Sequence, residues 1–191
     1  MSMNKVFMGK IRKELHSYQL KRREIIRESG DALHYAKRAI FSMHRDDMNE
    51  AETKIKEAEA IFKKLNIKFK TDKKILYEGS YKAAVEEYVE ASIFYQFITT
   101  GKISNIKSFA IDSDIYLAGL CDVPGELYRY AIKSATERND EMVKKCSKMA
   151  SDIIGELIEF DLTSYLRTKF DQAKQANQKL EHVVYEVSLI K

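Results

Sequence analysis

The sequence has 191 residues, of which 45% are apolar and 32% charged, and its formal net charge is +4. A chain of this length can bury one substantial core, and the mild positive charge permits binding to a polyanion without establishing it. The first residues are charged throughout and no apolar run approaches the roughly 20 residues of a membrane span, which argues against a signal peptide or a membrane protein. We therefore expect a soluble, cytoplasmic protein.

One proline and seven glycines leave few turn signals, which favours a mostly helical fold with short loops. Apolar spacing typical of a helix begins near residue 5, and Asp46 and Asp47 can cap the following helix. No internal repeat or interdomain linker is present, so residues 1–191 are predicted to form one all-α domain, a bundle of six or seven helices. The predicted helices span about 5–44, 46–65, 73–99, 113–136, 139–160 and 162–189, with a break at 66–72, a weak point at Gly79–Ser80 in the third helix, and a loop or short helix at 101–112.

Two carboxylates lie on the apolar face of the predicted helix 73–99. The face is formed by residues in steps of four, three, four and three: Ala83, Glu87, Glu90, Phe94 and Phe97. A buried, unpaired carboxylate is costly, so Glu87 and Glu90 must be protonated, paired with a cation or bound to a metal. Glu86 falls off this face, and we expect it to be solvated.

The predicted helix 113–136 carries a second pair of acids, Asp122 and Glu126, which are four residues apart and share a face. Gly119 and Gly125 flank that face and would let another backbone, or a bound chain, approach closely. Pro124, the sole proline, blocks a helical hydrogen bond, so we expect the helix to kink or restart there. This bend would aim both acids toward the pair on the preceding helix.

Four convergent carboxylates favour a hard divalent cation such as Mg²⁺, which can polarise a phosphodiester and activate a water. The alternative is a set of ordinary salt bridges, since 33 Lys and Arg side chains are available. A ferritin-like di-iron site would need Glu-x-x-His, which no predicted helix contains. The remaining candidates are expected to be structural. These are the buried thiols Cys121 and Cys146, the solvated acids Glu156 and Glu159, and four surface or packing histidines, His16, His34, His44 and His182.

The first predicted helix is rich in basic residues, with Tyr18 and Tyr35 interleaved among them. Such a face can follow a phosphate backbone. The alternative to nucleic-acid binding is a charged helix face that contains many i, i+4 ion pairs. The candidate nucleic-acid-binding residues are Arg12, Lys13, Arg22, Arg23, Arg27 and Arg38.

Four stretches resemble the translin family, and within it the translin-associated factor X (Trax) branch. They are AKRAIFSMHR (36–45), EEYVEASIFYQFI (86–98), SDIYLAGLCDVPGELYRYAI (113–132) and LRTKFDQAKQANQKLEHVVYEVSLI (166–190). The resemblance implies a metal-dependent endoribonuclease. The catalytic glutamates of that branch fall on Glu87 and Glu90, its catalytic aspartate on Asp122, and a further acid of its site on Glu126. The first three would hold Mg²⁺, with Mn²⁺ as an alternative.

The resemblance also implies assembly into a hollow homo-oligomer, typically an octamer, whose acidic sites face the interior. Two functions stay open: cleavage of single-stranded RNA inside such a shell, or non-catalytic binding of single-stranded RNA or DNA, as in translin-type subunits. The last predicted helix has an apolar seam of period 3.5, which packs either within the subunit or against a neighbouring one. The seam residues are Leu166, Phe170, Ala173, Asn177, Leu180, Val184 and Val187.

Overall fold

A computed structural model describes residues 3–189, which form six α-helices, one 3₁₀ helix and no strand. This confirms the predicted all-α fold. The elements are α1 (Lys5–His44), α2 (Met48–Lys68), η1 (Lys73–Tyr77), α3 (Gly79–Thr100), α4 (Ser113–Thr136), α5 (Asp140–Leu157) and α6 (Ser164–Leu189). None of the helices in this range is long and apolar enough to cross a bilayer.

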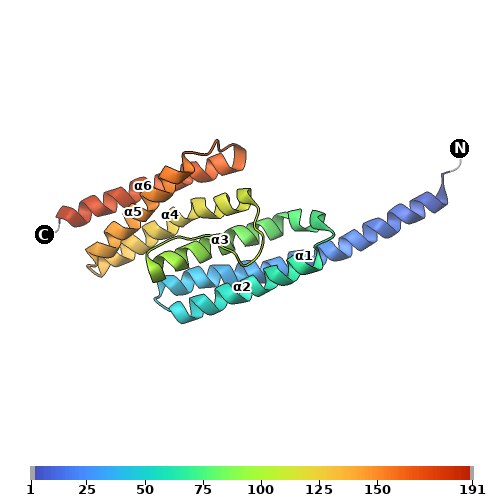
Figure 1. Ribbon diagram of the computed structural model, residues 1–191, viewed down its shortest axis with the longest axis horizontal. Coiled ribbons are helices and arrows are strands. Elements are labelled where there is room, and N and C mark those ends of the chain that lie inside the picture. Colours follow the sequence, from blue (N-terminus) through green and yellow to red (C-terminus); the bar gives the residue numbers. More distant parts are fainter. Residues whose placement is uncertain (1–2, 190–191) are drawn as a thin grey trace.

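The helices pack so that α3 and α4 lie side by side in the middle of the molecule (Figure 1). Helices α1 and α2 pair with each other and cover α3, whereas α5 and α6 pair with each other and cover α4. The N-terminal part of α1 extends well beyond the bundle, at the right of Figure 1. A side chain on the facing sides of α3 and α4 is therefore shielded from water by helices from both halves of the chain.

The core contains aromatic side chains from α2, α3 and the loop that follows α3. Phe62 and Tyr88 meet edge to face with ring centroids 5.4 Å apart, and Phe109 lies 5.2 Å from Phe62. Burying a large apolar side chain contributes about 1.5–3 kcal/mol. Helix α3 is buried over much of its circumference, so polar groups on it are poorly solvated.

The sequence predicted most helix ends, because capping residues mark them. Asp47 accepts a hydrogen bond from the Glu50 backbone and caps α2, and Gly101 ends α3 in the left-handed conformation at φ 70°. The predicted start of the third helix at residue 73 was wrong. Residues 73–77 form the 3₁₀ turn η1, and the extended backbone of Glu78 (φ −58°, ψ 136°) separates it from α3.

Three smaller predictions also need correction. The predicted break at 66–72 began too early, since α2 continues to Lys68, and the helix predicted to reach residue 160 ends at Leu157. Helix α4 runs without interruption from Ser113 to Thr136, so Pro124 does not restart it. Pro124 lies buried inside α4, where its ring removes one helical hydrogen bond.

The seam on α6 packs within the subunit along its central part. Helix α6 lies against α4 and α5, and the buried residues of the seam are Phe170, Ala173, Asn177 and Leu180. The Asn177 side chain accepts a hydrogen bond from Ser151 Oγ at 3.2 Å and donates one to Glu181 at 2.8 Å. Of the two alternatives for this part of the seam, the intramolecular one is therefore confirmed.

Candidate active site

Helices α3 and α4 approach most tightly at Gly119. A β-carbon built at Gly119 would lie 2.5 Å from the carbonyl oxygen of Glu86 and 2.8 Å from Cβ of Val89. This confirms that Gly119 admits another backbone, which is that of α3. No part of the described chain approaches Gly125, which is exposed and has no neighbour within 4 Å of such an atom, so close approach of a bound chain there stays a prediction.

Glu90 is the most enclosed acid of the site. It is 8% exposed, and its carboxyl group makes no hydrogen bond or ion pair with any other described residue. Desolvation raises its pKa to about 9, and the negative charges of Asp122, Glu87 and Glu126 add to this rise. Glu90 is therefore protonated at neutral pH while no cation is bound beside it.

Glu87 lies one helical turn before Glu90 and is partly buried. Desolvation raises the pKa of its carboxyl group, the positive charge of Lys37 opposes the rise, and Asp122 and Glu126 add to it. Lys37 belongs to α1, and its Nζ is 4.0 Å from Oε2 of Glu87. The charge on Glu87 is thus only weakly compensated.

Asp122 faces α6, where Lys169 donates a hydrogen bond to its Oδ2. Lys169 also forms an ion pair with Glu86, which in turn accepts a hydrogen bond from the Tyr165 hydroxyl at 2.8 Å. Desolvation raises the pKa of Asp122, and Lys169 counteracts that rise. The expectation that Glu86 is solvated was wrong: its side chain is 14% exposed because α6 covers it.

Glu126 contacts a residue from the other half of the molecule, His44 at the end of α1. His44 Nε2 lies against Oε2 of Glu126, and the imidazole is 6% exposed. The imidazole ring packs near Phe94 and Tyr130, with centroid distances of 5.2 and 6.1 Å. The interpretation of His44 as a surface or packing residue therefore missed its polar contact. The two residues are 82 positions apart, and nothing in the sequence links them.

The four predicted acids thus come together around the α3–α4 contact, close enough to raise the pKa of Glu90 by their charges. Their carboxylate oxygens do not converge on one point, because within residues 3–189 no three His, Cys, Asp or Glu side chains are placed to hold a metal ion. Asp122 and Glu126 instead point to Lys169 and His44. The donor chemistry nevertheless fits a hard divalent cation, because carboxylate oxygens are its preferred ligands and the unpartnered Glu90 would gain a counter-charge.

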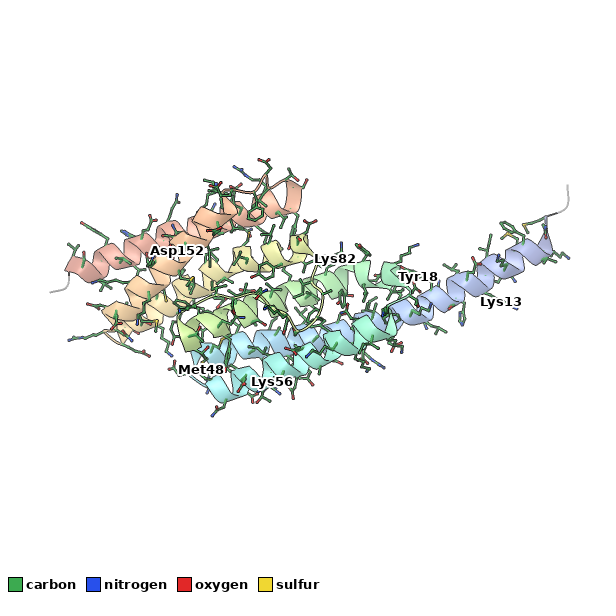
Figure 2. The ribbon with its side chains drawn as sticks, in the orientation of Figure 1. Lys13, Tyr18, Met48, Lys56, Lys82 and Asp152 are labelled. Carbon is green, nitrogen blue, oxygen red and sulfur yellow. The ribbon has the colours of Figure 1, made fainter. Side chains whose placement is uncertain are left out.

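The six candidate basic residues fall into two groups. Three of them pair with acids at 3.0 Å: Arg22 with Glu78, Arg27 with Glu28, and Arg38 with Glu50. The other three, Arg12, Lys13 and Arg23, are exposed and form no ion pair within the described part of the chain. Figure 2 shows Lys13 on the part of α1 that extends beyond the bundle. None of the three pairs has the i, i+4 spacing of the structural alternative, and binding of nucleic acid by this set stays a prediction.

The two thiols and the two acids expected to be structural behave as predicted. Cys121 and Cys146 are buried free thiols, and desolvation raises the pKa of each to about 12. Glu156 and Glu159 are exposed.

Comparison with known proteins places the chain in a family. A sequence model of the Translin family matches residues 20–191. An uncharacterized protein of Methanocaldococcus jannaschii is 28% identical over 163 residues, covering 83% of this chain and 72% of the relative. The Translin-associated protein X homolog of Schizosaccharomyces pombe is 25% identical over 190 residues, covering 90% of this chain and 82% of that protein.

Solved structures show the same fold. The structure of apo-NeC3PO superimposes with a TM-score of 0.86 at 24% identity, covering 98% of this chain and all of the other. A complex of AfC3PO with duplex RNA gives a TM-score of 0.88 at 22% identity, covering 96% and 97% of the two chains. Because the family model spans nearly the whole sequence, this protein belongs to the translin family.

Proposed function

We propose that this protein is a metal-dependent endoribonuclease of the Trax type, which cleaves single-stranded RNA at the acidic site between α3 and α4. The observation that carries the proposal is the carboxyl group of Glu90. It is buried without a partner, and three further carboxylates help to raise its pKa to about 9. Such a group is costly in a purely structural role, whereas a divalent cation would stabilise its ionised form.

In this proposal Glu87, Glu90 and Asp122 hold Mg²⁺ or Mn²⁺, which supplies Lewis-acid polarisation of the phosphodiester and an acidified water. The chain itself would supply the proton acceptor and the residues that position it. Glu126 accepts a proton from the attacking water at a carboxylate oxygen. His44 holds Glu126 in place through its Nε2 contact. Phe94 and Tyr130 pack near the His44 ring, which is 6% exposed.

Two features support RNA binding within an oligomer. The unpaired Arg12, Lys13 and Arg23 provide a basic surface that can bind RNA whatever its base sequence. The AfC3PO neighbour was solved with duplex RNA. The protruding part of α1 also exposes apolar side chains that no described part of its own subunit covers: Val6, Phe7, Leu15 and Leu20. Such a surface favours contact with further copies of the chain. We therefore propose a homo-oligomer, with the octamer as the expected form.

The second candidate function is non-catalytic binding of single-stranded RNA or DNA. The observation that favours it is the pairing of Asp122 with Lys169 and of Glu126 with His44, which leaves the carboxylates apart. The two functions are separated by incubating labelled single-stranded and duplex RNA with the pure protein, in Mg²⁺ or in EDTA, beside light scattering. We expect light scattering to give a mass several times 22.2 kDa. We also expect the single-stranded RNA to be cleaved in Mg²⁺ and to stay intact in EDTA. Retention of intact RNA in both buffers would favour the binder.

A further inference from the structure

Lys169 is the most enclosed cation beside the acidic site. Its side chain is 16% exposed, and it reaches from α6 to Asp122 on α4 and Glu86 on α3. Burial opposes its charge, but the hydrogen bonds with Asp122 and Glu86 outweigh burial and raise the pKa of Lys169. The ammonium group is therefore charged, and it occupies an oxygen of one proposed metal ligand.

Its second partner, Glu86, is held independently of Lys169. The Tyr165 hydroxyl donates to both oxygens of Glu86, at 2.8 and 3.1 Å, so the carboxylate keeps its place if Lys169 leaves Asp122. Glu86 is not among the residues assigned to the metal. Lys169 thus has two acceptors, one inside the proposed ligand set and one beside it.

We propose that Lys169 is a built-in counter-ion that competes with the divalent cation for Asp122 and, when the cation binds, releases Asp122 and keeps its contact with Glu86. The inference rests on the proposed function, because it requires a metal at Asp122. An ammonium group and a divalent cation cannot share one carboxylate oxygen at contact distance without strong repulsion. The ammonium group on Oδ2 also repels a cation bound at the other oxygen of Asp122, so release of Asp122 by Lys169 favours metal binding. The free energy of the Lys169–Asp122 contact is therefore subtracted from metal affinity.

The test compares Lys169→Met with Lys174→Met, each measured for Mn²⁺ binding by calorimetry and for melting temperature without metal. Lys174 lies on the same helix but pairs with Asp171 at 2.8 Å, away from the site, so its variant matches the loss of charge. We expect Lys169→Met to bind Mn²⁺ at least tenfold more tightly than wild type, and to melt lower without metal because Asp122 and Glu86 lose their shared cation. Lys174→Met should match wild type in Mn²⁺ affinity.

A second variant, Glu86→Gln, tests whether Glu86 retains Lys169 after Asp122 is released, and it serves if Lys169→Met does not fold. Without the acceptor at Glu86, Lys169 pairs with Asp122 alone, so Mn²⁺ affinity should fall. In the Lys169→Met background the same change should have little effect, because the two residues act through one contact. Unchanged or weaker Mn²⁺ binding by a folded Lys169→Met, or unchanged binding by Glu86→Gln, would overturn the inference. Absence of Mn²⁺ binding by wild type would instead overturn the proposed function on which it rests.

Discussion

Gly119 lies directly against the backbone of Glu86, since a β-carbon at Gly119 would stand 2.5 Å from the Glu86 carbonyl oxygen. Backbone atoms cannot move aside as a flexible side chain can, so α3 and α4 are fixed at this separation by the absence of a side chain. The contact lies one turn from Glu90 on α3 and about one turn from Asp122 on α4. It therefore sets the distance between the two pairs of acids.

Replacing Gly119 with Ala is expected to force α3 and α4 apart and to destabilise the protein by about 1–3 kcal/mol, as overpacking of a core does. Mn²⁺ affinity should fall as well, because Glu87 and Glu90 move away from Asp122. Gly125→Ala is the matched control: Gly125 lies in the same helix with free space around it, so alanine should add roughly 0.5–1 kcal/mol of stability. Chemical denaturation checks both variants, and equal stabilities would show that the close contact is not a constraint.

The pKa of Glu90 predicts how stability depends on pH. The folded protein keeps the Glu90 proton up to a pKa of about 9, whereas the ordinary value is 4.5. The folded state therefore binds more protons between these values, and stability falls as pH rises from about 5 to 9. Glu90→Gln imitates the protonated form, so its metal-free stability should match wild type at pH 5 and exceed it by roughly 2–4 kcal/mol at pH 8.

Melting curves in EDTA at both pH values measure this difference. The control is Glu156→Gln, which changes an exposed glutamate and should follow the wild-type curve at each pH. If Glu90→Gln were less stable than wild type at pH 8, Glu90 would be ionised and paired in the folded protein, and its assignment as an unpartnered acid would be incorrect.

His44 is expected to act through Glu126 rather than on RNA directly. His44→Ala removes the contact that orients Glu126, and decreases of roughly 10–100-fold are usual when such a supporting residue is removed. The decrease should appear in the cleavage rate, whereas Mn²⁺ affinity should change little because Glu126 is not assigned to the metal. His182→Ala is the control, since His182 is exposed and distant in the chain. A parallel decrease in Mn²⁺ affinity would place Glu126 among the metal ligands.

The helices were predictable because buried apolar residues recur every three or four positions, and the acids were predictable because Glu87 and Glu90 interrupt that pattern. Their cationic partners were not. Lys169 and Asp122 are 47 positions apart, and their meeting depends on how α6 packs across α4. The burial of Glu86 was missed for the same reason. The sequence of a helix predicts which of its residues share a face, but it does not predict which other helix packs over that face.

Binding of RNA should depend on the unpaired basic residues of α1 more than on the paired ones. Arg23 forms no ion pair in the described chain, whereas Arg38 is neutralised by Glu50 at 3.0 Å. Arg23→Ala should weaken binding to single-stranded RNA and reduce the slope of log affinity against log salt by roughly 0.7 for each phosphate that the protein no longer neutralises. Arg38→Ala should change the slope less. Equal slopes for wild type and both variants would exclude this surface of α1 from the RNA interface.

The central claim is that the acidic site between α3 and α4 cleaves RNA with a divalent cation. The most direct test is single-turnover cleavage of end-labelled single-stranded RNA by wild type, Asp122→Asn and Glu156→Gln, each in Mg²⁺ and in EDTA. Light scattering establishes that the three proteins assemble alike. We predict that wild type and Glu156→Gln cleave in Mg²⁺, and that Asp122→Asn in Mg²⁺ falls to the level of wild type in EDTA. Cleavage by Asp122→Asn at the wild-type rate would contradict the account.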